Sequence, residues 1–262
     1  MTPNTPPVNP LLERSRLPGE IHRLPSRGIF YNHGELDPSV RDGEVQVFAM
    51  TMIDEITVRS PDLLFSGDAI KQVIRRCVPQ ILKPEALLAK DVDFLMLVLR
   101  KASYGDVEID YEHNCKEAKS HSYIIPVDTL IKSARSIDPA TVGSRFSVTM
   151  PNGMIVKVSP MRFQAIVDML QMTDKELTPE QAKDRAIKVL LDIIESVDNI
   201  TDKRMISEWL STIPVGWTND IDKAIQRAQD DWGSDMTFKF SCKDCGGEVK
   251  TAVPMNPLAF FI

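Results

Sequence analysis

One order of local patterns occurs twice along this chain, and it restricts the folds that the chain can adopt. Apolar residues alternate at Val45 and Val47, follow helical spacing as far as Ala102, and alternate again from Val107 to the end of a hairpin. The same order starts again at Val156. Alternation is the period of a strand, and i, i+3, i+4 spacing is that of a helix. The sequence therefore predicts an α+β fold of two units, each ending in a short antiparallel hairpin.

The two units are related by nearly constant shifts in residue number. A shift of 111 relates four apolar positions near each strand: Val45, Val47, Met50 and Met52 to Val156, Val158, Met161 and Phe163. A shift of 128 relates Tyr104-Gly105 to Trp232-Gly233 and Pro126 to Pro254, so both hairpin segments span 22 positions. We interpret the units as degenerate repeats, the second with 17 more residues between strand and hairpin.

These patterns predict the following organisation. An extended arm occupies residues 1–42, the first repeat 43–130 with its hairpin at 106–126, and a linker 131–145. The second repeat is 146–262, with a hairpin at 236–254 and an apolar tail. Within the repeats, Asp91 is expected to cap a nearly all-apolar helix that Gly105 closes. Thr178 to Gln181 forms a capping box for a helix whose apolar face extends to Val197.

The two ends of the chain differ in character. Residues 1–20 have no periodic apolar pattern and contain five prolines: Pro3, Pro6, Pro7, Pro10 and Pro18. Such a segment does not fold alone, and it is either a loose chain end or an arm that lies along a neighbour. The tail from Asn256 to Ile262 is apolar and contains Phe260 and Phe261. It either packs on its own fold or docks on another subunit.

Composition excludes several functions. The net charge is −6, which disfavours wrapping nucleic acid or lying on an anionic membrane. No apolar run reaches the roughly 18 residues of a membrane span, and the densest, Phe94–Leu99, is expected to be a buried helix. The first residues lack the features of a signal peptide. Four cysteines are too few for a disulfide scaffold, so a reducing compartment is expected.

No pattern in the chain indicates catalysis. GxSxG, HExxH, GxxxxGK[ST] and GxGxxG are all absent from the sequence. The histidines His22, His33, His113 and His121 belong to no recognisable nucleophile–base pattern. We therefore expect no enzyme, no catalytic residue and no organic cofactor.

One motif has the spacing of metal ligands. Cys242 and Cys245, followed by two glycines at a hairpin tip, have the arrangement of a zinc knuckle. A structural zinc needs four ligands, and Cys115, His113 and His121 are candidates for the others if the two hairpin tips meet. The alternative is a vestigial knuckle, because a shift of 128 places Asn114 and Glu117 opposite the two cysteines. A redox CxxC is disfavoured, because a strand and not a helix follows.

Several blocks, in order, resemble a family of baseplate proteins from contractile-tailed bacteriophages. Leu24–Tyr31 (LPSRGIFY) is similar to the family's LPS-x-G-x-x-Y opening, and Gly43–Thr51 to its next block. Ser60–Val78, Asp91–Tyr111 and the terminal CxxCG hairpin ending in NPLAFF also resemble family segments. The family pattern has a CxxC in the first hairpin too, and this chain departs from it there, which bears on the zinc site and not on the family.

The resemblance implies a hub or hub-assembly protein of the T-even type, a structural part of the virion tail baseplate that is made in the host cytoplasm. Its expected partners are other phage baseplate and tail proteins, with no nucleic acid and no membrane. The residues that we expect at interfaces are Phe260, Phe261, Leu24, Phe30 and Tyr31.

Two alternatives remain. The first is an assembly factor that helps the hub form and then leaves, so that it is absent from purified tails. The second is a zinc-ribbon adaptor that contacts nucleic acid, which needs a basic patch with interleaved aromatic residues. It is disfavoured because the basic pairs Arg75-Arg76 and Arg100-Lys101 are short and flanked by apolar helix.

Overall fold

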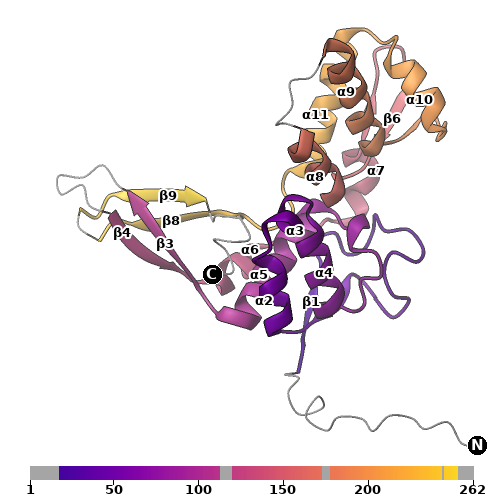
Figure 1. Cartoon of the computed structure of the whole chain (residues 1–262). Coiled ribbons are helices and arrows are strands. Elements are labelled where there is room, and N and C mark those ends of the chain that lie inside the picture. The colour runs from indigo at the N-terminus through magenta and orange to yellow at the C-terminus, as the bar shows by residue number, and fades with distance from the viewer. Residues whose placement is uncertain (1–17, 113–119, 173–177, 244, 253–262) are drawn as a thin grey trace, which may run out of the picture.

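A computed structural model describes residues 18–112, 120–172, 178–243 and 245–252. Figure 1 shows three parts: a central lobe of helices, a second lobe above it, and an arm of two hairpins that projects to one side. The central lobe comprises residues 18–106 and 126–134, and the second lobe residues 135–235. The hairpin arm comprises the strands of 107–125 and 236–252.

The central lobe is built on one almost fully buried helix. Its elements are β1 (Glu20–Arg23), β2 (Glu44–Val47), α2 (Met52–Val58), α3 (Pro61–Phe65), α4 (Asp68–Cys77), η1 (Pro84–Ala86), α5 (Ala89–Tyr104) and α6 (Val127–Ser133). Helix α5 is the buried one, from Ala89 to Arg100, and it ends at Gly105 with a φ of 85° as predicted. Its N-terminal cap is Leu88, so Asp91 lies inside the first turn and not at the cap that we expected.

The hairpin arm consists of two hairpins stacked on each other. They are β3 (Val107–Glu112) with β4 (Ser120–Ile125), and β8 (Thr237–Ser241) with β9 (Glu248–Ala252), both antiparallel. Tyr123 and Phe240 stack across the two hairpins with ring centroids 3.9 Å apart. Phe240, Cys242 and Val249 belong to the same apolar core as the central lobe. The last hairpin therefore completes the core of the first half, and Figure 1 shows it lying along the first hairpin.

The second lobe has its own core around a small antiparallel sheet. Its elements are η2 (Pro139–Thr141), α7 (Val142–Arg145), β5 (Ser147–Thr149), β6 (Ile155–Val158), α8 (Phe163–Met172), α9 (Pro179–Ile193), β7 (Ile194–Val197), α10 (Lys203–Leu210) and α11 (Val215–Gln229). The predicted capping box at Thr178 and Gln181 is present. The helix expected to reach Val197 instead ends at Ile193, because the next four residues pair with β6 as strand β7.

The two lobes are joined by main-chain hydrogen bonds at two places. The amide of Ala89 donates to Met161 O at 2.9 Å, and the amide of Phe163 donates to Leu87 O at 2.8 Å. In the expected linker 131–145, Ile137 is 1% exposed, and its amide donates to Pro25 O at 2.9 Å. Ile137 belongs to the core of the second lobe, so this residue ties the otherwise largely exposed segment to both lobes.

The structure confirms an α+β fold with two antiparallel hairpins at the expected segments; that the two halves are repeats stays a prediction. Residues 18–42 of the expected arm pack on the central lobe, because Glu20–Arg23 pairs with β2 and Leu24 is fully buried. Residues 1–17 lie outside the described residues.

Candidate functional site

Two left-handed turns face each other in the segment 24–43. Arg27 and Asp42 have φ values of 56° and 52°, and the glycines after them, Gly28 and Gly43, have 75° and 72°. Arg27 Nε donates to Asp42 Oδ1 at 2.6 Å, and this hydrogen bond holds the pKa of Asp42 below its usual value. A Cβ on Gly43 would lie 2.7 Å from Arg27 Cα. Strained conformations at non-glycine residues often mark functional sites.

Below these turns, Tyr31 and Ser26 hold a buried carboxylate. Tyr31 Oη donates to Asp91 Oδ2 at 2.7 Å, and the amide of Ser26 donates to Asp91 Oδ1 at 3.0 Å. The amide of Leu88 donates to Tyr31 Oη at 3.0 Å. Burial raises the pKa of Asp91 to about 6, against the lowering effect of these donors. The LPSRGIFY segment is thereby fixed to the first turn of α5.

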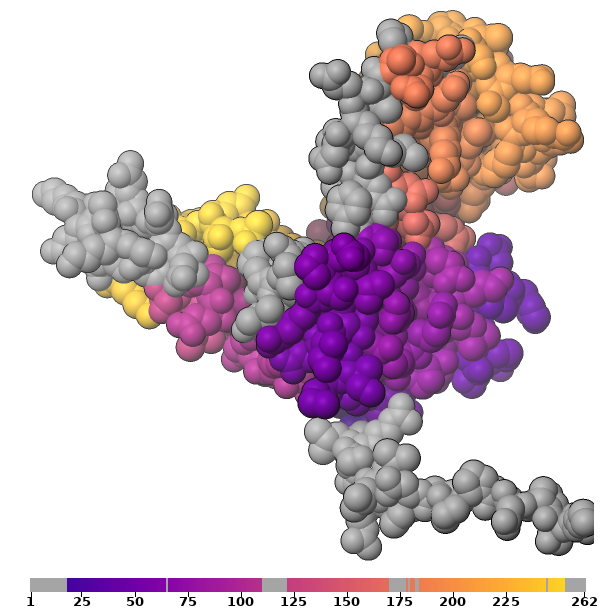
Figure 2. Space-filling model, in the orientation of Figure 1, coloured from indigo at the N-terminus to yellow at the C-terminus, as the bar shows by residue number. Residues whose placement is uncertain are grey.

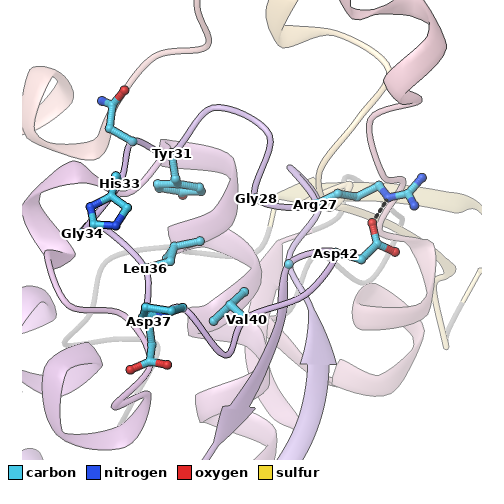
Figure 3. Close-up of a pocket in the computed structure, with 12 residues that line it drawn as sticks. Arg27, Gly28, Tyr31, His33, Gly34, Leu36, Asp37, Val40 and Asp42 are labelled. Carbon is cyan, nitrogen blue, oxygen red and sulfur yellow. Dashed lines mark hydrogen bonds and ion pairs between the residues drawn. The ribbon is translucent and has the colours of Figure 1, made fainter.

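A hollow of about 290 Å³ opens beside the two turns (Figure 3). Figure 3 shows Tyr31, Leu36 and Val40 along its floor, between His33 on one side and the Arg27–Asp42 pair on the other. In Figure 2 the indigo loop residues form a hollowed surface on the side of the central lobe away from the hairpin arm. We call this hollow the loop pocket.

Three of the residues expected at intermolecular interfaces hold the chain together internally. Leu24 is 0% exposed and belongs to the central core, which rules it out as a surface contact in this structure. The Phe30 ring meets Phe146 of the second lobe edge-on, with centroids 4.7 Å apart. Arg162 Nη2 donates to Phe30 O at 3.3 Å, and its Nη1 donates to Ala86 O. Phe30 therefore lies at the junction of the lobes, and Tyr31 lines the loop pocket. Phe260 and Phe261 lie outside the described residues.

The CxxC motif, where two zinc ligands were expected, lies at the tip of the second hairpin. Cys242 is buried and Cys245 exposed, and Gly246, with a φ of 69°, makes the turn between the strands. The amide of Gly247 donates to Cys245 Sγ at 3.4 Å. Within the described ranges, no group of three or more His, Cys, Asp or Glu side chains could hold a metal ion. His113 and Cys115 lie outside those ranges, as does the side chain of His121.

The strand registers show that the two hairpins differ in loop length. The last pair of the first hairpin is Glu112 with Ser120, and the last pair of the second is Ser241 with Glu248. Seven residues lie between the first two along the sequence and six between the second two. A single shift of 128 therefore does not fit both strands, and the match of Asn114 and Glu117 to the two cysteines stays a prediction.

Helix α2 has its polar and apolar faces inverted. It buries Asp54 and Thr57 together with Val58 at its end, while Met52, Ile53 and Ile56 are 74%, 62% and 61% exposed. Burial raises the pKa of Asp54, but the hydrogen bonds that its carboxylate accepts from Thr51 and Arg76 outweigh burial, so that its pKa is lowered. The exposed apolar surface of α2 could not be predicted from the sequence. Residue spacing shows that a helix is amphipathic, but it does not show which face packs against the core.

The comparison with known families defines the class of this protein. Residues 43–262 match the family described as "T4 bacteriophage base plate protein". The chain belongs to this family and is a structural baseplate protein of a T4-type phage tail. No curated protein and no solved structure matches it. In the part of the chain that the structure describes, no helix is long and apolar enough to cross a bilayer.

Proposed function

We propose that this baseplate protein is a hub or hub-proximal subunit that is retained in the virion and acts through protein–protein contacts, without catalysis. The observation that carries the proposal is the inverted helix α2. A helix on a monomer surface normally turns its apolar face inward. Here a bonded carboxylate faces the core, and three large apolar side chains face water.

The energetics of this face favour a docking surface. Fully burying a Met or Ile side chain contributes about 1.5–3 kcal/mol, so covering the three would supply a substantial part of a subunit contact. Tyr104 at the end of α5 is 40% exposed and is hydrogen-bonded to Glu55 of α2. Its ring adds to the exposed apolar surface of α2. Clustered exposed apolar residues of this kind mark interaction sites, whereas isolated ones do not.

A phage carrying the triple substitution Met52→Ser, Ile53→Ser and Ile56→Ser tests this proposal. We expect the isolated variant to keep the parent's melting temperature, because these side chains are already exposed, and to be depleted from purified tails measured by quantitative mass spectrometry. The matched control is Met205→Ser with Val215→Ser, which alters side chains that are 53% and 78% exposed on the second lobe.

The same measurement separates the retained subunit from an assembly factor. A retained subunit is present in parental tails in a fixed integer ratio to other tail proteins. An assembly factor is absent from parental tails, although tails do not form without it. Normal incorporation of the triple variant would show that α2 is not the docking surface.

We also propose that Cys242 and Cys245 provide two ligands of a structural zinc, with the others drawn from His113, Cys115 and His121. The support is the turn geometry at Gly246 and the amide that donates to Cys245 Sγ. Bound zinc would contribute only cross-linking of the two hairpin tips.

A further inference from the structure

The loop pocket has the form of a site for a short extended peptide. Its floor combines the Tyr31 ring with the aliphatic side chains of Leu36 and Val40, and its rim carries the exposed polar side chains of Asn32 and His33. A volume of about 290 Å³ lies at the lower end for small-molecule sites. Flat aromatic and aliphatic floors with polar rims are typical of sites that bind proline-rich segments.

The floor is also rigid before anything binds. The hydroxyl of Tyr31 is held by Asp91 and by the amide of Leu88, so that its ring cannot turn out of the pocket. The facing wall is fixed by the ion pair between Arg27 and Asp42. A preformed site loses little conformational entropy on binding, which favours even a short ligand.

The chain itself contains a segment of the matching chemistry. Residues 1–17, which lie outside the described residues, contain Pro3, Pro6, Pro7 and Pro10. Proline-rich chains favour polyproline II, which has no internal hydrogen bonds and leaves its carbonyls for donors on a partner. At about 3.1 Å per residue, 17 such residues reach roughly 50 Å, far enough to cross to an adjacent subunit.

The direction of β1 indicates which copy's pocket the segment meets. Strand β1 runs from Glu20, opposite Val47, to Arg23, opposite Glu44, and so leads toward the pocket. The residues before Pro18 therefore leave from the end of β1 remote from the pocket. To reach the pocket of their own copy, they would have to turn back and run along the whole length of β1, whereas a second copy can be met in the direction in which they leave.

We propose that residues 1–17 of one copy dock in the loop pocket of a second copy. The proline rings pack on Tyr31, Leu36 and Val40, and the rim side chains donate to the carbonyls of the docked segment. The contact joins two different patches of the molecule. Two copies that exchange arms therefore form a closed dimer, and copies that each dock an arm on the next form a ring.

Sedimentation velocity of the full chain, over a range of concentrations, measures this association. We expect the parent to self-associate, and Pro6→Ser with Pro7→Ser to weaken the association by about tenfold or more. Val40→Asp, which places a charge on the floor, should do the same. Its matched control is Val215→Asp, the same change at a site 78% exposed on the second lobe, and this variant should associate as the parent does.

Because Val40 also packs on the central core, a second pocket variant is needed in case Val40→Asp unfolds. His33→Ala changes an exposed rim residue and should weaken association without lowering the melting temperature.

Mixing the variants shows whether the contact is between copies. The arm variant keeps an intact pocket and the pocket variant keeps an intact arm, so an equimolar mixture should associate more strongly than either variant does alone. A monomeric parent, unchanged association of both variants, or a mixture that stays monomeric would each overturn the proposal. The measurement uses the isolated chain, so its failure leaves the proposed place in the tail untouched, and the tail measurements can fail independently.

Discussion

Replacing Tyr31 by phenylalanine removes one oxygen atom from the interior and keeps the ring that lines the loop pocket. That oxygen donates to Asp91 Oδ2 at 2.7 Å and accepts from the Leu88 amide at 3.0 Å. Asp91 and Leu88 are both 0% exposed, so water cannot replace the lost partner without opening the structure.

The expected cost follows from these two bonds. A hydrogen bond to a charged group contributes about 1.5–3 kcal/mol, and a buried donor left without a partner costs about 1–3 kcal/mol. We therefore expect Tyr31→Phe to lower the free energy of unfolding by about 3–5 kcal/mol at pH 7. A loss this large would unfold a marginally stable chain, so the measurement is best made at low temperature.

The deficit should depend on pH in a definite direction. The pKa of Asp91 is about 6 in the folded chain, because burial raises it, against about 3.9 for a free carboxyl. The folded state therefore binds the proton more tightly, and the stability of the parent rises as the pH falls from about 6 to about 4, by roughly 3 kcal/mol at most. Asp93, with a pKa also raised to about 6 by burial, contributes in the same window.

Tyr31 donates to the ionised form of Asp91, so its removal raises the pKa of Asp91 further. The difference in stability between Tyr31→Phe and the parent should thus be largest above the raised pKa of the variant, shrink as the pH falls through that pKa to about 6, and stay constant at lower pH. Asp93 is present in both proteins, and taking the difference removes most of its contribution.

Urea denaturation at a series of pH values measures this difference. Tyr123→Phe is the matched control, because its ring is stacked on Phe240 and its hydroxyl has no hydrogen-bond partner among the residues that the structure describes. A loss below about 0.5 kcal/mol for Tyr31→Phe, or a deficit that grows as the pH falls, would refute the reasoning.

Four further outcomes are expected. Gly43→Ala should lower the melting temperature by several degrees, because its Cβ would lie 2.7 Å from backbone atoms and its φ is 72°. Elemental analysis of the chain purified without chelator should find one zinc per chain, and serine at both cysteines of the Cys242–Cys245 motif should abolish it. Deleting residues 1–17 should leave the melting temperature nearly unchanged but lower incorporation into tails. Alanine at Phe260–Phe261 should lower incorporation if the tail docks on a neighbour, and the melting temperature if it packs on its own fold.

Features that the sequence predicted correctly are those set by neighbouring residues. The stop of α5 at Gly105 and the capping box at Thr178 depend on groups within one helical turn, and local spacing is enough to find them. The hairpins were found for the same reason, since alternation is a local signal. The registers needed the structure, because a one-residue difference in loop length is invisible to a single shift.

Features that depend on distant partners could not be predicted. Asp91 is a residue type that often caps helices, but its oxygens accept hydrogen bonds from Ser26 and Tyr31, which are 65 and 60 positions away. Helix α2 has the spacing of an amphipathic helix, yet its polar side faces the core, because Asp54 forms an ion pair with the distant Arg76. The break after Ile193 depends on pairing with β6, since an apolar run suits helix and strand equally.

The stacking of the last hairpin on the first has a consequence for how this chain is made. Lys243 Nζ donates to Ser122 O across 121 positions, and Phe240 fills part of the core begun by the first hundred residues. The earliest segment to leave the ribosome therefore waits, with part of its apolar surface uncovered, until almost the whole chain has been translated. A chain released early would keep that surface open to proteases and chaperones, so only completed chains would survive to be built into tails.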